Sequence, residues 1–241
     1  MMGAQLHVTK LAAARRQLRT AIRMFFAGED ELAIHTVASA AHRIIADLKK
    51  ERGSDVVGDS HAMRVFYVVR DYRRGTLPKR LTDDPEAMKG IQEMAEELPI
   101  TASTKYEDIK VCVSTETARK WWQKRNKVSN FLKHADRDAK AHISLQEVDN
   151  LELLSQALAS YTDLVQDDLG AEGLVFWMYL NVVTETVDQL PEEYRDMAWK
   201  LEELDHDEQL EFCSLVIDGM NETDPQQLAS QRFDPKSGPH L

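Results

Sequence analysis

Cysteine is scarce in this chain, and long apolar runs are missing. Its 241 residues include two cysteines, Cys112 and Cys213, and neither belongs to a CxxC or CxxH pattern that would suggest zinc. We therefore expect neither a metal nor a cofactor, and a reducing, cytoplasmic location. The longest uncharged apolar run, from Gly173 to Thr184, is shorter than the about 20 residues that span a bilayer. It predicts a buried helix and no membrane partner.

Acidic residues are missing before Glu29, whereas basic residues are scarce after residue 140. Residues 1–140 hold 26 Lys and Arg against 19 Asp and Glu, and residues 141–241 hold 4 against 22. A positive N-terminal part would attract phosphates, which a strongly acidic C-terminal part would repel. The alternative, which we favour, is that the two parts face each other, within one chain or across a dimer, and neutralise each other locally.

The sequence also lacks a Gly-rich phosphate loop, a pattern typical of a nucleophilic triad and an internal repeat. What it has almost throughout is helical periodicity of apolar residues. We therefore predict an all-α fold, a multi-helix bundle with one short extended segment near residues 109–113, where apolar and polar residues alternate. Residues 1–220 form one predicted domain, which could divide near residue 140, and residues 221–241 form a tail with little to bury.

Caps and turn residues predict where the helices begin. Asp30 would cap a second helix. The first helix is basic, and on its own it would also fit a transit peptide or a membrane-surface helix. The polar loop GSDVVGDS, which starts at Gly53, predicts that the third helix begins near His61. Two capping boxes are expected for later helices, at Ser144–Glu147 and at Asp205–Glu208.

The helix that follows the extended segment carries a polar strip. Asn126, Asn130 and His134 fall on one side of this helix, away from its apolar residues. Arg137 would extend the strip by one turn, and Arg125 projects close to the apolar stripe. Amides, an imidazole and a guanidinium can bind phosphate and move a proton, whereas solvated faces are richer in Lys and Glu. The alternative for His134 is a surface histidine whose charge suits a helix C-terminus.

The paired Ala-rich N-terminal helices, followed later by a helix with an RN…H element, resemble the HEPN group of small α-helical proteins over about residues 10–142. The resemblance implies a dimer that cleaves RNA without a metal. Its arginine would bind the scissile phosphate, and its histidine would act as acid or base toward the ribose 2′-hydroxyl. Arg137 and His142, in RDAKAH, fit the family spacing. Arg125 and His134 depart from it because eight residues separate them, although the KHAD context of His134 resembles the family's histidine more closely.

A basic patch and a pair of histidines complete the candidate residues. The patch is a candidate for contacts with a nucleic-acid backbone, and a solvated helix end is the alternative. His35 and His42 lie on one side of the second helix without a metal-binding pattern, so we expect boundary or dimer-interface residues. The basic patch comprises Arg70, Arg73, Arg74, Lys79 and Arg80.

From the sequence, the function that we expect first is a non-catalytic interaction module that self-associates through its Ala-rich helices. A metal-independent RNase of the HEPN type is the first alternative, and nucleic-acid binding without cleavage is the second. The expected partners are therefore a second copy of the chain, RNA or another protein.

Overall fold

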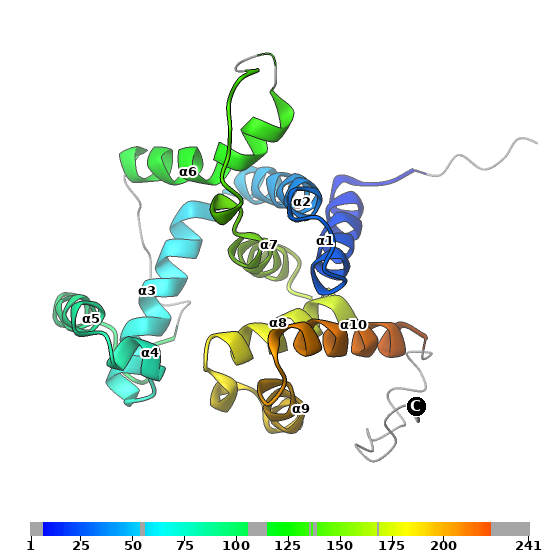
Figure 1. The fold of residues 1–241 in the computed structure, drawn as a ribbon. Coiled ribbons are helices and arrows are strands. Elements are labelled where there is room, and N and C mark those ends of the chain that lie inside the picture. Colours follow the sequence, from blue (N-terminus) through cyan, green and yellow to red (C-terminus); the bar gives the residue numbers. More distant parts are fainter. Residues whose placement is uncertain are drawn as a thin grey trace, which may run out of the picture.

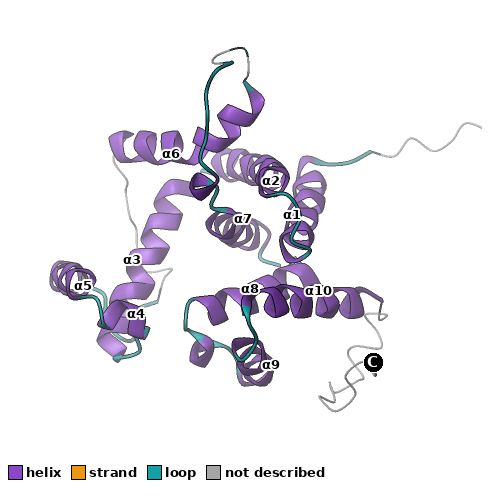
Figure 2. Cartoon of the chain, viewed as in Figure 1, coloured by secondary structure: helices purple, strands orange, loops and turns teal. Residues whose placement is uncertain are grey.

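The fold was obtained as a computed structural model, which describes residues 7–53, 56–105, 115–134, 136, 139–167 and 169–222. Within these ranges, the side chains of residues 56–63, 117, 118, 121, 124, 125 and 222 are not described. The described residues form helices, turns and loops, with no strand among them (Figures 1 and 2). The predicted all-α class is confirmed. No helix in these ranges is both long enough and apolar enough to cross a membrane.

Ten α-helices and two short 3₁₀ helices make up the described part of the chain. In chain order they are α1 (Lys10–Phe26), α2 (Glu31–Glu51), α3 (Val56–Arg74), α4 (Lys79–Thr82), α5 (Pro85–Glu97), α6 (Thr115–Lys133), η2 (Leu145–Glu147), α7 (Asn150–Val165), α8 (Ala171–Val183), η3 (Val187–Gln189), α9 (Glu192–Glu202) and α10 (His206–Glu222).

The α1–α2 hairpin illustrates how local sequence sets the helix ends. Gly28 adopts a positive φ of 62° between the two helices, a conformation that costs glycine little. Asp30 then caps α2, because its carboxylate accepts a hydrogen bond of 2.9 Å from the backbone N–H of Ala33. The predicted cap is thus confirmed, and the tight turn places α1 and α2 side by side.

The main hydrophobic core lies where the α1–α2 hairpin meets α7, α8, α9 and α10 (Figure 1). Its members come from both sides of residue 140, so the core does not divide where the charge changes sign. An aromatic cluster joins α1 to α8 through edge-to-face contacts, which aromatic rings favour. Its rings are those of Phe25, Phe26, Phe176 and Tyr179.

A second, smaller core lies between α3 and α5. Phe66 and Val69 of α3 pack there against Ala95 of α5 and against Ile100, which follows it. Figure 1 shows α4 and α5 at the end of α3 that points away from α1 and α10. Helices α3, α4 and α5 therefore form an arm with its own apolar contacts.

Ion pairs join the basic N-terminal part to the acidic C-terminal part. Glu172 at the start of α8 accepts from two arginines of α1, with N···O distances of 2.8 Å to Arg19 and 2.6 Å to Arg23. Lys49 pairs with Asp163 at the C-terminal ends of α2 and α7. Further pairs join Arg64 to Glu152 and Lys127 to Glu147. Within one chain, the two parts thus neutralise each other at these contacts.

Two predicted helix starts are wrong. Helix α3 begins at Val56 rather than near His61, so the expected polar loop contributes its last residues to the helix. Ser144 does not cap a long helix but precedes η2, whereas α7 begins later with the Asp149 carboxylate accepting from the N–H of Glu152. Polar residues within a few positions offer several start sites, and packing selects one. The second capping box, Asp205–Glu208, is confirmed by reciprocal hydrogen bonds of 3.0 and 3.1 Å.

Two further predictions concern residues that lie mainly outside the described ranges. The expected extended segment at 109–113 lies within residues 106–114, and the expected tail at 221–241 overlaps residues 223–241. The first two residues of that tail, Asn221 and Glu222, form the end of α10.

Candidate functional site

A polar pocket of about 220 Å³ lies where α6 crosses α2, and it contains the predicted polar strip of α6. We call it the α2–α6 pocket. Residues four apart on a helix lie on one side, so α6 presents a line of side chains from Trp122 to His134 toward α2. The lining consists of Ser39, His42 and Arg43 from α2, Trp122, Asn126, Ser129, Asn130 and Lys133 from α6, His134 directly after α6, and Leu153 from α7.

Depth varies across the pocket. His42 and Ser129 are buried, with 3% and 6% of their surfaces exposed, and they form its inner side. Asn126 and His134 are half-buried, whereas Lys133 is exposed at the mouth. A ligand would therefore meet a cation first and hydrogen-bonding groups farther in.

The charge of the lining is one-sided. Arg43, Lys133 and two histidines contribute basic groups, and none of the described lining residues is acidic. Two carboxylates stand nearby: Asp47 lies 3.3 Å from Arg43, and Asp136 lies 3.9 Å from Nδ1 of His134. The side chains of Arg43 and Asp47 are 61% and 59% exposed, so this pair contributes little and leaves the arginine able to bind an anion.

Trp122 forms an aromatic wall of the pocket. Its ring centroid lies 6.4 Å from that of His42, with the rings tilted by 44°. The guanidinium carbon of Arg43 lies 5.8 Å from the ring centroid, within the range of a cation–π contact. Trp122 thus contacts both basic α2 side chains beside the α6 strip.

The arrangement suits a small anionic group better than a metal ion or a drug-sized ligand. Amide, hydroxyl, imidazole, ammonium and guanidinium groups all donate hydrogen bonds to oxyanions. Typical pockets for drug-sized ligands have about 300–1,000 Å³, which exceeds this volume. Among the described residues, no group of three or more His, Cys, Asp or Glu side chains could hold a metal ion.

Of the residues predicted from the sequence, the structure brings Asn126, Asn130 and His134 together in this pocket. His142 is exposed and follows the turn after Lys140, and it is not among the lining residues. The side chain of Arg125 lies outside the described residues.

Arg137 and its neighbour Asp138 also lie outside the described residues. An arginine–histidine pair of the HEPN type therefore stays a prediction in either of its two forms.

Sequence reasoning missed the contribution of α2. His42 is buried, and so is His35 with 5% of its surface exposed, so neither is a boundary residue as expected. The sequence did contain a pattern that could have predicted this contribution. His42 and Arg43 follow Ser39 by three and four residues, which places three polar groups on one side of an otherwise Ala-rich helix.

The predicted basic patch of α3 and α4 is engaged within the chain. Arg70 donates to the Asp71 carboxylate at 2.8 and 3.0 Å, and its guanidinium lies 4.6 Å from the centroid of the Tyr67 ring. Arg73 donates to the carbonyl of Ala95, and Arg74 to that of Ala102 at 2.9 Å.

These bonds hold the α3–α5 arm together. The remaining two members of the patch, Lys79 and Arg80, are exposed on α4. Contact of the patch with nucleic acid stays a prediction.

Comparison of the chain with protein family models, with curated proteins and with solved structures finds no match.

Proposed function

We propose that the protein binds single-stranded RNA through phosphate contacts in the α2–α6 pocket. The supporting observation is the composition of the lining: the cations Arg43 and Lys133, two histidines and no acidic side chain among the described lining residues, in a chain with a net charge of −11. A cationic pocket on an acidic protein draws an anion to one place, because the rest of the surface repels it.

The lining assigns a task to each side chain. Lys133 and Arg43 at the mouth neutralise phosphate charge, and Asn126 and Asn130 donate to phosphate or base oxygens. Trp122, whose ring lies under the Arg43 guanidinium, adds an aromatic surface that a base can contact. Such contacts recognise the phosphate backbone and the aromatic character of a base, so we expect binding that is weakly selective for RNA sequence.

Salt and substitution test this function together. We would titrate the full chain into a 5′-fluorescein-labelled octauridylate and follow fluorescence anisotropy at several salt concentrations. Two or three phosphate contacts predict a slope of log affinity against log salt between about −1.4 and −2.1. Lys133→Gln should weaken binding about tenfold and reduce the magnitude of the slope by about 0.7, the contribution of one lost contact.

Lys200→Gln on α9 is the matched control, because Lys200 is also an exposed helical lysine but lies outside the pocket. Equal affinity of the Lys133→Gln and Lys200→Gln proteins would exclude the pocket as the RNA site. An affinity that does not depend on salt would exclude phosphate binding altogether.

RNA cleavage without a metal is a second candidate function, and the observation that favours it is the presence of two imidazoles, His42 and His134, in one pocket. One imidazole would take the proton of a ribose 2′-hydroxyl, whose oxygen then attacks the adjacent phosphorus. The other would donate a proton to the departing 5′-oxygen. The products would be a 2′,3′-cyclic phosphate and a 5′-hydroxyl, with Arg43 stabilising the added negative charge.

Cleavage of a mixed RNA in excess EDTA separates the alternatives. The pocket mechanism predicts that His134→Ala abolishes cleavage while His142→Ala does not. A HEPN-type pair of Arg137 with His142 predicts the reverse, whereas a pair of Arg125 with His134 predicts the same result as the pocket mechanism. Cleavage that survives both substitutions would come from a contaminant, and an intact substrate with the wild-type chain would leave binding as the function.

Self-association through the Ala-rich helices has less support. Ala14, Ala21, Ala38 and Ala41 have none of their surface exposed, because they pack in the core of their own chain. A second copy would have to use another surface.

A further inference from the structure

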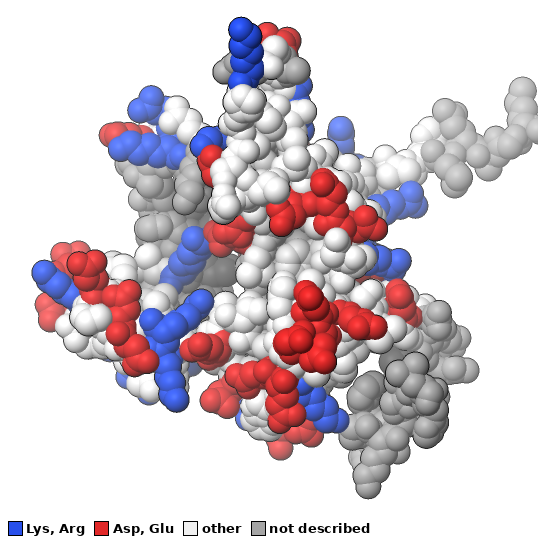
Figure 3. Space-filling view, in the orientation of Figure 1, with Lys and Arg blue, Asp and Glu red and all other residues white. Residues whose placement is uncertain are grey.

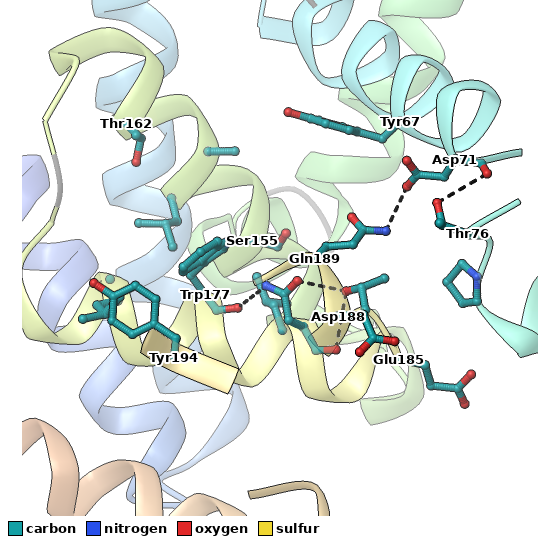
Figure 4. Close-up of a pocket in the computed structure, with 18 of the residues that line it drawn as sticks. Tyr67, Asp71, Thr76, Ser155, Thr162, Trp177, Glu185, Asp188, Gln189 and Tyr194 are labelled. Atoms are coloured by element: carbon teal, nitrogen blue, oxygen red, sulfur yellow. Dashed lines mark hydrogen bonds between the residues drawn. The ribbon is translucent and has the colours of Figure 1, made fainter. Parts of the chain in front are cut away.

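A large groove separates the α3–α4 side of the arm from α7, α8 and η3 (Figure 4). We call it the α3–α8 groove. Its volume of about 2200 Å³ exceeds the about 300–1,000 Å³ of pockets for small molecules. The groove shares no lining residue with the α2–α6 pocket. Its occupant is therefore of a different size, and its use is independent of RNA binding.

Three of the α7 residues that line this groove have small side chains. Ser155, Ala159 and Thr162 follow one another at spacings of four and three, so they lie on one side of the helix. Small residues in such a row let the backbone of a neighbouring helix approach closely. All three residues line the groove.

Large aromatic side chains stand on two sides of the groove. Tyr67 on α3 is 41% exposed, and Trp177 on α8 is 37% exposed. The ring of Trp177 meets that of Tyr194 edge to face at 6.1 Å, which fixes its position. Exposed, pre-positioned Trp and Tyr side chains are typical of the residues that carry most of the energy of a protein interface.

The two walls differ in charge. Arg70, Arg74 and Lys79 lie on the α3–α4 wall, but Arg70 is paired with Asp71, and Arg74 is bonded to the carbonyl of Ala102. The opposite wall carries acidic residues, and Figure 3 shows blue and red side chains facing each other across this part of the molecule. These acidic residues are Asp163, which is paired with Lys49, and Asp167, Glu185 and Asp188. Acidic residues therefore outnumber basic ones in the groove.

A hydrogen bond ties the walls together at one end. Nε2 of Gln189 in η3 donates to Oδ2 of Asp71 in α3 at 3.0 Å, as Figure 4 shows. Beside it, the Thr186 hydroxyl donates to Oδ1 of Asn181 at 3.0 Å, and Asn181 donates to the carbonyl of Trp177 at 2.8 Å. The Gln189–Asp71 bond joins the walls before any partner arrives, and the other two bonds order one wall; such preorganisation lowers the cost of binding.

We propose that the α3–α8 groove binds a basic amphipathic α-helix of a partner protein. A helix with a radius of about 5 Å and a rise of about 1.5 Å per residue fills about 120 Å³ per residue. The volume of the groove thus equals that of about 18 helical residues, or five turns. The apolar ridge of the helix packs between Tyr67 and Trp177 and against the small side chains of α7. Its Lys and Arg residues meet the wall that contains Glu185 and Asp188.

The test uses synthetic 18-residue peptides and the full chain. One peptide of Leu and Lys has its leucines three and four apart, so that they form one stripe. A second peptide has the same composition in scrambled order, and a third has Glu in place of Lys. Anisotropy of the fluorescein-labelled peptides at physiological salt should show binding of the striped Leu/Lys peptide at least about tenfold tighter than of the other two.

Substitutions on the protein locate the site. Trp177→Ala should weaken binding of the striped peptide about tenfold or more, and so should the double reversal Glu185→Lys with Asp188→Lys. The matched controls are Trp199→Ala, an exposed tryptophan of α9, and Glu211→Lys with Asp218→Lys on α10, all outside the groove. Circular dichroism would verify that each variant is folded, and the charge reversal serves if the tryptophan variant is not.

Any of the following outcomes would overturn the proposal: equal binding of the striped and scrambled peptides, tighter binding of the Leu/Glu peptide, or equal losses in the groove variants and their controls. The first and third would identify general attraction of cations to an acidic surface. The second would assign the groove to an acidic partner. Absence of measurable binding of the striped peptide would overturn it as well.

Discussion

Replacement of Glu172 by Gln should lower the free energy of unfolding by about 2 kcal/mol at neutral pH. None of the Glu172 surface is exposed, and its two carboxylate oxygens accept hydrogen bonds from Arg19 at 2.8 and 3.0 Å and from Arg23 at 2.6 Å. Arg19 also donates to Asn221 at 3.1 Å, so the cluster joins α1, α8 and α10. Its loss would affect three helices of the main core.

The magnitude follows from the exposure of the partners. Breaking a fully buried ion pair by removing one member costs about 3–5 kcal/mol, because the remaining charge is left without compensation. Here the side chains of Arg19 and Arg23 are 33% and 48% exposed, so water recovers part of their solvation. Gln also keeps one oxygen as an acceptor. Both effects reduce the expected loss to about 2 kcal/mol.

The pH dependence gives a second check on the same residue. Burial by itself raises the pKa of Glu172, but hydrogen bonds from Arg19, from the backbone and from Arg23 outweigh it, so the folded pKa lies below the ordinary 4.5. A group with a lowered folded pKa stabilises the protein fully above its unfolded pKa, and this contribution is lost as pH falls through the folded pKa. The difference between wild type and Glu172→Gln should therefore shrink below pH 4.5.

Urea unfolding followed by circular dichroism at pH 7 and at two or three acidic pH values measures both quantities. Asp47→Asn is the matched control, since its pair with Arg43 is exposed and should contribute less than about 0.5 kcal/mol. A Glu172→Gln protein as stable as this control at pH 7 would refute the reasoning. So would a difference from wild type that grows on acidification.

Two further predictions concern packing and a buried thiol. A Cβ at position 173 would lie 2.6 Å from Cβ of Leu169 and 3.3 Å from Cδ1 of Leu158, so Gly173→Ala should destabilise the protein by about 1–3 kcal/mol. A Cβ at position 90, inside α5, has no atom within 4 Å, so Gly90→Ala should instead stabilise the protein by about 0.5–1 kcal/mol. Urea midpoints of the two variants that shift in the same direction would contradict this contrast. Burial raises the pKa of Cys213 to about 12, so in a Cys112→Ser background an aromatic disulfide reagent at pH 8 should react only after denaturant is added. Rapid reaction of the native protein would show that the thiol is accessible.

Helices were predictable from the sequence because most of them bury one face. In α2, the apolar positions Ile34, Ala38, Ala41 and Ile45 repeat at three and four, and the structure buries all of them. Starts marked by a single strong cap, such as Asp30, were also predictable. Starts within a cluster of polar residues were not, as the shift of the α7 cap from Ser144 to Asp149 illustrates.

The candidate site was predictable in one half only. The polar line of Asn126, Asn130 and His134 belongs to a single helix, and helical geometry places its members together. That this line faces His42 is a result of how α6 crosses α2, and periodicity within one helix carries no information about crossings. The engagement of Arg73 and Arg74 with backbone carbonyls escaped prediction for the same reason, since both acceptors lie more than 20 residues away.

The main core combines helices from the two ends of the chain, and this affects how the protein folds during its synthesis on the ribosome. The α1–α2 hairpin packs against α7 and α8, and 108 positions separate Ile45 from Leu153. At about 5–20 residues per second, a ribosome needs roughly 5–20 s to cover that distance. During this interval Glu172, whose carboxylate pairs with Arg19 and Arg23, has not yet been synthesised. A nascent chain that ends near residue 140 therefore lacks the helices that cover the apolar face of this hairpin in the finished protein.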